Sequence, residues 1–271
     1  MIIAQITDLH LRTDGQPLKG RVDSVAALNA AIEHLNLLQP RPDLVLVTGD
    51  LVNKAHSQDY QGLRRELDRL DMPSYVIPGN HDERHMIRRY FGDCGYLPED
   101  GDFLHYTIED EHFPLRLIGL DTKRLGHDGG EMCTARLQWL DHTLSAAPER
   151  PTLIFMHHPP FVTGIGFMGV KRFDGGREME AIIARHGQVQ RVVCGHAHRD
   201  ITVRWGGTVA SVASSLVFQM SLDLREGAKS SFVLEPPACA IYKWHVDQGL
   251  IAHRSVIGEF GPRHPFVVDP L

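Results

Sequence analysis

Five short apolar segments, each followed closely by aspartate, asparagine or histidine, constrain the fold of this chain more than any other feature. The segments and the polar residues after them are Ile2–Ile6 with Asp8 and His10, Leu44–Val47 with Asp50, Ser74–Ile77 with Asn80, 152–156 with His157, and 190–194 with His196 and His198. Short apolar runs rich in β-branched residues and without polar alternation predict buried strands. The pattern therefore predicts a sheet whose strands end in polar side chains.

Amphipathic segments separate these strands. Apolar residues at helical spacing predict helices at 22–38, 58–70, 134–146 and 176–187. Alternating strands and helices favour parallel pairing with helices on both faces. The sequence thus predicts an α/β core of the βαβαβ type.

Further strands are expected at 115–120 and 207–212. The final third of the chain loses helical periodicity, and residues 239–246 and 250–257 within it are expected to pair around a turn at 247–249. No repeat or linker divides the 271 residues, so we expect a single domain, 1–271.

Composition excludes several classes of protein. The formal net charge of -6 argues against a broad basic surface for nucleic acid. No run reaches the roughly 18–20 apolar residues of a membrane helix, and no secretory signal is visible at the N-terminus. The four cysteines lack CxxC spacing, so we expect free thiols and a cytoplasmic protein. Histidine is unusually frequent, with 17 residues where about six are typical of this length.

The polar residues after the five strands form one candidate site. Each has an ordinary alternative when taken alone: Asp8 could cap a helix, Gly49-Asp50 and Asn80 could form turns, and His196 and His198 could be exposed loop residues. Together they lie at the carboxyl ends of strands, where ligands bind in open α/β sheets. Imidazole, carboxylate and amide donors without thiolate suit Fe, Mn, Co or Zn in an open catalytic site.

These motifs resemble those of the calcineurin-like metallophosphoesterase superfamily. Its pattern of D-x-H, GD, GNH-D/E, H and G-H-x-H stands here as Asp8-Leu9-His10, Gly49-Asp50, Gly79-Asn80-His81-Asp82, His157 and Gly195-His196-Ala197-His198. The resemblance implies a four-layer αββα sandwich of two mixed sheets flanked by helices. It also implies two metal ions, with Asp8, His10, Asp50 and His198 holding one and Asp50, Asn80, His157 and His196 the other. Asp50 would bridge them.

The expected chemistry is metal-dependent hydrolysis. A shared carboxylate brings two ions within roughly 3.5–4 Å, close enough to activate a hydroxide that attacks phosphorus in line. Two divalent ions, two aspartates and a hydroxide leave about one positive charge, which a phosphodiester anion balances. Asn80, His81 and His198 are expected to contact substrate. His81 is the expected catalytic residue and could stabilise phosphoryl charge or protonate the leaving alkoxide, or it could only hydrogen-bond a ligand. Asp82 is expected to orient His81 or cap the next helix.

The branch of the superfamily follows from the residues around the motifs. Protein Ser/Thr phosphatases carry Asp-Arg-Gly shortly after GD, whereas this chain continues with Leu51-Val52-Asn53-Lys54. Mre11-like nucleases are usually longer. The chain is most similar to bacterial class III cyclic nucleotide phosphodiesterases and related glycerophosphodiesterases, in segments such as Ile77–Asp82, Met156–Pro160 and Leu234–Cys239.

The resemblance implies a hydrolase of small phosphodiesters, such as cAMP or a glycerophosphodiester. A phosphomonoesterase and a non-catalytic metal-binding scaffold are the alternatives. The loops 12–21, 164–172 and 218–232 are candidates for substrate selection, and Asn53, His56 and His158 could reach a substrate, although His158 could also pack behind the site. Residues 218–238 could form a cap and a contact in a homo-dimer or higher oligomer, or could complete the core. Neither a membrane nor a stable nucleic-acid partner is expected.

Overall fold

The structure is a computed structural model that describes residues 1–170, 173–262 and 264. The α-helices are α1 (Ser24–Leu37), α2 (Ser57–Leu67), α3 (Arg84–Phe91), α4 (Thr134–Ser145) and α5 (Gly176–Arg185). Two 3₁₀ segments are η1 (Gly92–Cys94) and η2 (Gly166–Val170). The strands are β1 (Ile2–Ile6), β2 (Leu44–Val47), β3 (Ser74–Val76), β4 (Tyr106–Ile108), β5 (Arg116–Leu120), β6 (Thr152–Met156), β7 (Val189–Cys194), β8 (Ile201–Trp205), β9 (Thr208–Val212), β10 (Gln219–Met220), β11 (Phe232–Val233), β12 (Ala238–His245) and β13 (Gly249–Val256).

Most strands belong to two mixed sheets. The first sheet has the order β13-β12-β1-β2-β3, in which β1, β2 and β3 are parallel and β12 runs antiparallel to β1. The second sheet has the order β4-β5-β6-β7-β9-β8, with β5, β6, β7 and β9 parallel. A third, two-stranded sheet pairs β10 with β11.

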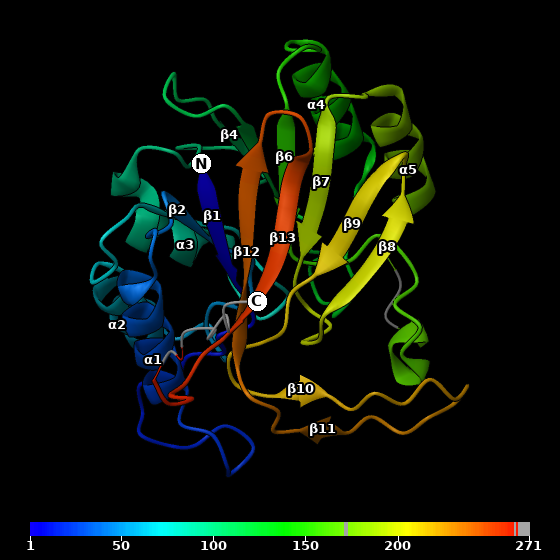
Figure 1. Cartoon of the computed structure of the whole chain (residues 1–271). Coiled ribbons are helices and arrows are strands. Elements are labelled where there is room, and N and C mark those ends of the chain that lie inside the picture. The colour runs from blue at the N-terminus through cyan, green and yellow to red at the C-terminus, as the bar shows by residue number, and fades with distance from the viewer. Residues whose placement is uncertain (171–172, 263, 265–271) are drawn as a thin grey trace, which may run out of the picture.

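The two large sheets pack face to face with helices outside. Along β6, Leu153 and Phe155 belong to the core cluster shared with the first sheet, whereas Ile154 and Met156 belong to the cluster that contains residues of α4 and α5. Because side chains alternate across a strand, one face of the second sheet meets the first sheet and the other meets the helices. Figure 1 shows α1, α2 and α3 on one side of the sandwich and α4 and α5 on the other. This arrangement confirms the predicted four-layer αββα fold.

Local sequence signals explain where α1 begins and ends. The Asp23 side chain accepts hydrogen bonds from the backbone N–H groups of Val25 and Ala26, each at 3.0 Å, so it is an N-cap. The helix stops at Leu37, ahead of Pro40, which cannot continue a helix.

Several expectations from the sequence need correction. The expectation of helices on both faces of one sheet was wrong, because the inner face of each sheet packs against the other sheet and not against helices. Helix α3, strand β8 and the hairpin β10–β11 were not predicted. The hairpin of 239–246 and 250–257 is confirmed as β12 and β13, although β13 already starts at Gly249. In the expected substrate loop 164–172, residues 171 and 172 lie outside the described residues.

Two smaller expectations can also be compared with the structure. All four cysteines are free thiols, as predicted. No helix among the described residues is long and apolar enough to span a membrane.

A candidate dinuclear metal centre

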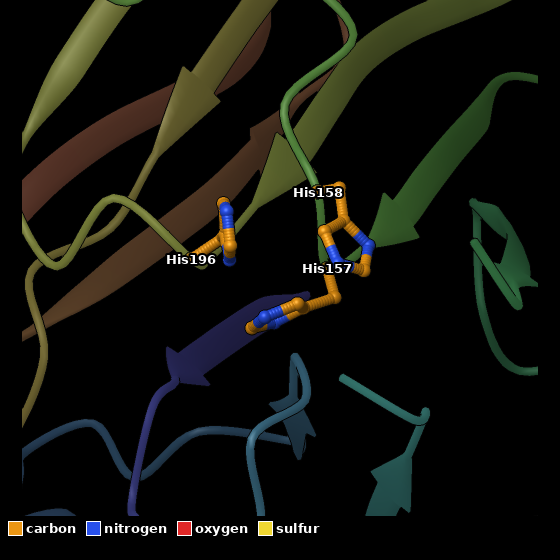
Figure 2. Close-up of side chains that lie close together, drawn as sticks. All are labelled: His157, His158 and His196. Atoms are coloured by element: carbon orange, nitrogen blue, oxygen red, sulfur yellow. The ribbon is translucent and has the colours of Figure 1, made fainter. Parts of the chain in front are cut away.

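The carboxyl ends of five parallel strands meet where the two sheets adjoin. Asp8, Asp50 and Asn80 follow β1, β2 and β3 of the first sheet, and His157 and His196 follow β6 and β7 of the second. Figure 2 shows His157 and His196 converging from the end of β6 and from the loop after β7. The fold thus brings ligand-type side chains from both sheets to one place.

Asp8, His10, Asp50 and His198 form the first group of candidate ligands. All four are buried, and their ligand atoms lie within 4.8 Å of one another. The Nε2 atom of His198 is 3.2 Å from Asp8 Oδ1 and 3.1 Å from the Nε2 atom of His10. His10 Nε2 is 3.6 Å from Asp50 Oδ2.

The second group meets the first at Asp50. His157 Nε2 lies 3.4 Å from Asp50 Oδ1 and 3.2 Å from Asn80 Oδ1. His196 joins this side, since its ligand atom lies within 4.8 Å of those of His157 and His158. One oxygen of Asp50 therefore faces each group, which is the geometry of a bridging carboxylate.

Backbone carbonyls fix the tautomers of two histidines. The Nδ1 atoms of His157 and His198 lie 2.8 Å from the carbonyl oxygen of Thr48 and 3.0 Å from that of Phe218. A carbonyl only accepts, so each Nδ1 must donate, which in a neutral ring leaves a lone pair on Nε2. Both lone pairs point at carboxylate oxygens, an arrangement that needs a proton or a cation between them. Metal-ligating histidines generally donate their other ring nitrogen to a carbonyl or carboxylate in this way.

The charges of the two aspartates and of His10 suit a cation. Burial alone would raise the pKa of Asp8, but His198 beside it holds the pKa below its usual value. Burial likewise opposes ionisation of Asp50, yet His157 and His10 keep its pKa well below the usual range. Burial lowers the pKa of His10 to about 3, so this ring is neutral. Ionised carboxylates and a neutral imidazole are the protonation states that a metal requires.

His157 carries the proton that a metal would have to displace. Burial lowers the pKa of this ring, but the Asp50 carboxylate outweighs burial and raises it to about 9. A positive charge between His157 and Asp50 is needed whether it is the proton on His157 or a bound metal ion. The residues present therefore fit a divalent cation.

The backbone of the site is strained. Six non-glycine residues in the described part of the chain have positive φ, and five of them are candidate ligands: Asp8, His10, Asp50, His196 and His198, with φ from 43° to 70°. Such conformations are uncommon outside glycine and cost on the order of 1–3 kcal/mol each. Their concentration at one place indicates a functional site. The sixth residue, Lys19, lines the cavity of about 340 Å³ that opens over these candidate ligands.

Glycines before the ligands permit close approach. A Cβ at Gly79 would lie 2.2 Å from the backbone nitrogen of Asp50, and a Cβ at Gly195 would lie 2.1 Å from Thr7 Oγ1. Real Cβ atoms essentially never come within 3.0 Å of another heavy atom. These two motif glycines are thus required by the packing of the loops that carry the ligands.

His81 and Asp82 differ in what they contact. The backbone N–H of His81 donates to Asp50 Oδ1 at 2.9 Å, and its exposed ring places Nδ1 2.8 Å from the carbonyl oxygen of Asn53. The expected roles of Asp82, orienting His81 or capping the next helix, were wrong. Its buried carboxylate accepts from the backbone of Gly79 at 2.8 Å and of Leu51 at 3.1 Å, and Glu83 is the N-cap of α3. Burial and the nearby Asp50 raise the pKa of Asp82 to about 6.

The hairpin β10–β11 lies over the cluster of candidate ligands. It helps enclose a cavity of about 340 Å³ that reaches His10, Asp50, Asn80 and His81. The other lining residues include Lys19, Asn53, Phe218, Met220, Ser230, Ser231 and Phe232. The sequence indicated the loops 12–21 and 218–232 but missed Lys19 and the two serines, because no local pattern marks which loop residues face the site.

Two further histidines named from the sequence lie apart from this cavity. His56 is exposed at the N-cap of α2 and is not among the lining residues. His158 is buried, with Nδ1 2.8 Å from Thr122 Oγ1, and it borders a separate cavity of about 830 Å³ together with His196. His158 thus does not line the cavity over the candidate ligands, but the cavity that it borders adjoins that one at His196, which lines both.

Known proteins are similar to this chain in sequence and in fold. Residues 1–200 match the model of the calcineurin-like phosphoesterase family. The chain is 38% identical over 267 residues to a probable glycerophosphodiester phosphodiesterase, GpdQ, of Arcobacter nitrofigilis, covering 98% of this chain and 97% of that protein. It is 29% identical over 205 residues to the 3',5'-cyclic adenosine monophosphate phosphodiesterase CpdA of Escherichia coli K12, covering 76% and 72%. A dimetal phosphatase from Danio rerio shares the fold with a TM-score of 0.67 at 14% identity, covering 95% of this chain and 99% of that chain.

Proposed function

The chain belongs to the calcineurin-like phosphoesterase family, and we propose that it hydrolyses small phosphodiesters at a dinuclear metal centre, with a glycerophosphodiester as the preferred substrate and a cyclic nucleotide as the alternative. The observation that carries the dinuclear centre is the position of the Asp50 carboxylate, one oxygen of which faces His10 and the other His157. The preference for glycerophosphodiesters is supported by a match over nearly the full length of both chains to a relative of that name.

The proposed ligands are those with converging donor atoms. Asp8, His10, Asp50 and His198 would hold one ion, and Asp50, Asn80, His157 and His196 the second. Bound there, two divalent ions would supply an activated water nucleophile and positive charge opposite the phosphoryl oxygens. The donor set suits Mn, Fe, Zn or Co.

The side chains of the pocket would bind the phosphate and supply a proton to the leaving group. His81 lies on the open side, where its ring meets that of His10 edge to face with centroids 4.6 Å apart. The carbonyl of Asn53 accepts from His81 Nδ1 and would orient the ring, so that Nε2 faces the departing alkoxide as its proton donor. Asn80 and His198 would contact the bound phosphate. Lys19, which has no ion-pair partner among the described residues, would add a positive charge at the rim.

Substrate kinetics test the proposal. Metal-free protein reconstituted with Mn²⁺ should hydrolyse bis-p-nitrophenyl phosphate much faster than the monoester p-nitrophenyl phosphate, and a glycerophosphodiester faster than cAMP. Asp50→Asn should abolish all four activities. A strong monoester preference would instead make the chain a phosphomonoesterase, and inactivity with every metal would leave a binding scaffold.

Three wider proposals accompany the activity. Residues 1–271 would form one catalytic domain in which 218–238 serves as a cap, since β10 and β11 lie over the pocket. The exposed residues Leu222, Leu224 and Leu234 on this cap would form part of a homo-dimer contact. Light scattering of the wild type and of a Leu224→Glu variant would test this, with a monomeric wild type as the contrary result. Four free thiols support a cytoplasmic location.

A further inference from the structure

Lys123 is a buried lysine outside the family motifs. It follows the end of β5, and its side chain is 6% exposed. An ammonium group taken out of water is costly unless hydrogen bonds and a counter-charge compensate it. The partners of this group therefore indicate why it is there.

Among the described residues, the hydrogen-bond partners of the Lys123 ammonium all lie in one four-residue segment, 80–83. Nζ donates to the carbonyl oxygen of Asn80 at 3.0 Å, to the carbonyl oxygen of Asp82, and to Glu83 Oε1 at 3.3 Å. A lysine has three N–H donors, so this one segment uses its full capacity. The segment begins with Asn80, the proposed neutral ligand of the second ion.

A reciprocal contact from Arg84 completes a clamp, the set of hydrogen bonds that joins residues 80–84 to residues 121–123. Arg84, the first residue of α3, donates to both oxygens of Asp121, at 2.5 and 2.9 Å, and to the carbonyl oxygen of Lys123 at 2.7 Å. The buried Arg136 adds a bond at 3.1 Å to the same carbonyl. Two loops, 80–84 from the first sheet and 121–123 from the second, are thereby fastened together.

The clamp connects Asn80 to the sheet that carries His157. Strands β5 and β6 are parallel neighbours, with Leu120 opposite Met156, so Lys123 and His157 leave the same edge of the second sheet. Asn80 comes from the first sheet, yet its Oδ1 lies 3.2 Å from His157 Nε2. We propose that Lys123 is a positioning residue that holds Asn80 at the second metal site by binding the backbone carbonyls of Asn80 and Asp82 and the side chain of Glu83. The inference rests on the proposed role of Asn80 as a ligand.

Direct metal binding tests the proposal without substrate. Calorimetric titration of metal-free protein with Mn²⁺ should show that Lys123→Met weakens one of the two sites by about 10–100-fold, the usual effect of removing a group that orients a ligand. The other site should stay within about twofold. The EPR signal of coupled Mn²⁺ pairs should appear only at higher Mn²⁺ in the variant. In kinetics at fixed Mn²⁺, kcat should fall and KM should change little.

Arg116→Met is the matched control. Arg116 is an equally buried cation on β5, at the opposite end of that strand, where it pairs with Glu109 and donates to the Thr143 carbonyl. This variant should lose thermal stability but keep both Mn²⁺ affinities. If Lys123→Met does not fold, Lys123→Arg replaces the compact ammonium by a planar fork and should weaken the same site.

A double-mutant cycle separates positioning from the field of the lysine charge. In an Asn80→Ala background, Lys123→Met should change the affinity of the weakened site by less than about threefold, because its effect passes through Asn80. Unchanged Mn²⁺ affinities in Lys123→Met, or a full loss that persists without Asn80, would overturn the proposal. Failure of the enzyme to cleave diesters would count against the proposed function alone.

Discussion

Adding one methyl group at Gly79 should disable the metal centre. The Cβ of an alanine there would lie 2.2 Å from the backbone nitrogen of Asp50, 2.2 Å from its Oδ1 and 2.9 Å from its Cγ. Ordinary van der Waals contact begins at 3.4 Å, so Asp50 and residue 79 must separate by about 1.2 Å, the difference between 3.4 and 2.2 Å. The backbone nitrogen cannot swing aside as the end of a flexible side chain could.

That displacement falls on the residue proposed to bridge the two ions, whose Oδ1 faces one group of candidate ligands and whose Oδ2 faces the other. Asp50 Oδ1 faces His157 and also accepts from the backbone of His81, so moving it disturbs the ligand geometry and the proposed catalytic residue together. A misplacement of about 1 Å in a catalytic arrangement costs on the order of 100-fold in rate, or about 2.7 kcal/mol of transition-state stabilisation. The same crowding should cost about 1–3 kcal/mol of folding stability.

The assay is kcat/KM for bis-p-nitrophenyl phosphate at saturating Mn²⁺, with metal content measured on the same samples. Gly79→Ala should lose roughly 100-fold. The control is Gly92→Ala, because Gly92 has a helical φ of -63° and a Cβ added there would meet nothing within 4 Å; this variant should stay within about twofold. A Gly79→Ala protein that keeps normal Mn²⁺ content and kcat/KM within about threefold of wild type would refute the reasoning.

Three further variants test separate parts of the structure. His81→Gln should lower kcat by about 100-fold with bound metal unchanged, and the loss should be larger for an alkyl than for a p-nitrophenyl leaving group; equal losses would argue against proton donation. Lys19→Gln should raise KM by up to about fivefold through loss of a rim charge, whereas Lys243→Gln, remote on β12, should not. Burial lowers the pKa of His105 to about 4, so the unfolded chain takes up a proton before the folded one and stability falls as pH drops from about 6.5 towards 4. His105→Asn should therefore remove about 2 kcal/mol of the loss in unfolding free energy between pH 7.5 and 5, measured by urea denaturation of metal-free protein; an identical pH dependence in both proteins would contradict this.

Much of the sandwich could be predicted because its strands are simple apolar runs. Leu44–Val47 and Thr152–Met156 are buried at every position, and the apolar run in each was enough to mark the strand. The strand β8 was missed because its burial alternates and it follows the His196 loop directly. The hairpin β10–β11 has only two residues in each strand, which is too short for a periodic signal. Its position over the site depends on tertiary contacts that no local pattern encodes.

The supporting contacts of the site were also beyond local patterns. Lys123 lies 40 residues or more from the groups that it binds, and nothing near it in sequence identifies them. Lys19 likewise enters the pocket only because a tight turn, closed by a bridge between Leu18 and Val22, places it there. The candidate metal ligands come just after strands, so the sequence identifies them. The residues that fix the loops in place, such as Lys123, follow no such pattern.

The two-residue spacing in D-x-H and H-x-H has a physical basis in the core. Leu9, between Asp8 and His10, is buried in the cluster built around the first sheet. Ala197, between His196 and His198, is buried in the cluster of the second sheet. Each motif thus anchors its middle residue in its own half of the molecule and presents both neighbours to the metal centre, with φ values between 43° and 70°. Strained ligands can persist only where surrounding structure holds them, so each pair depends on its own core cluster. The centre consequently lies on the junction of the two halves, and any contact that fixes one half against the other, as the clamp at Lys123 does, also fixes the distance between the two groups of ligands.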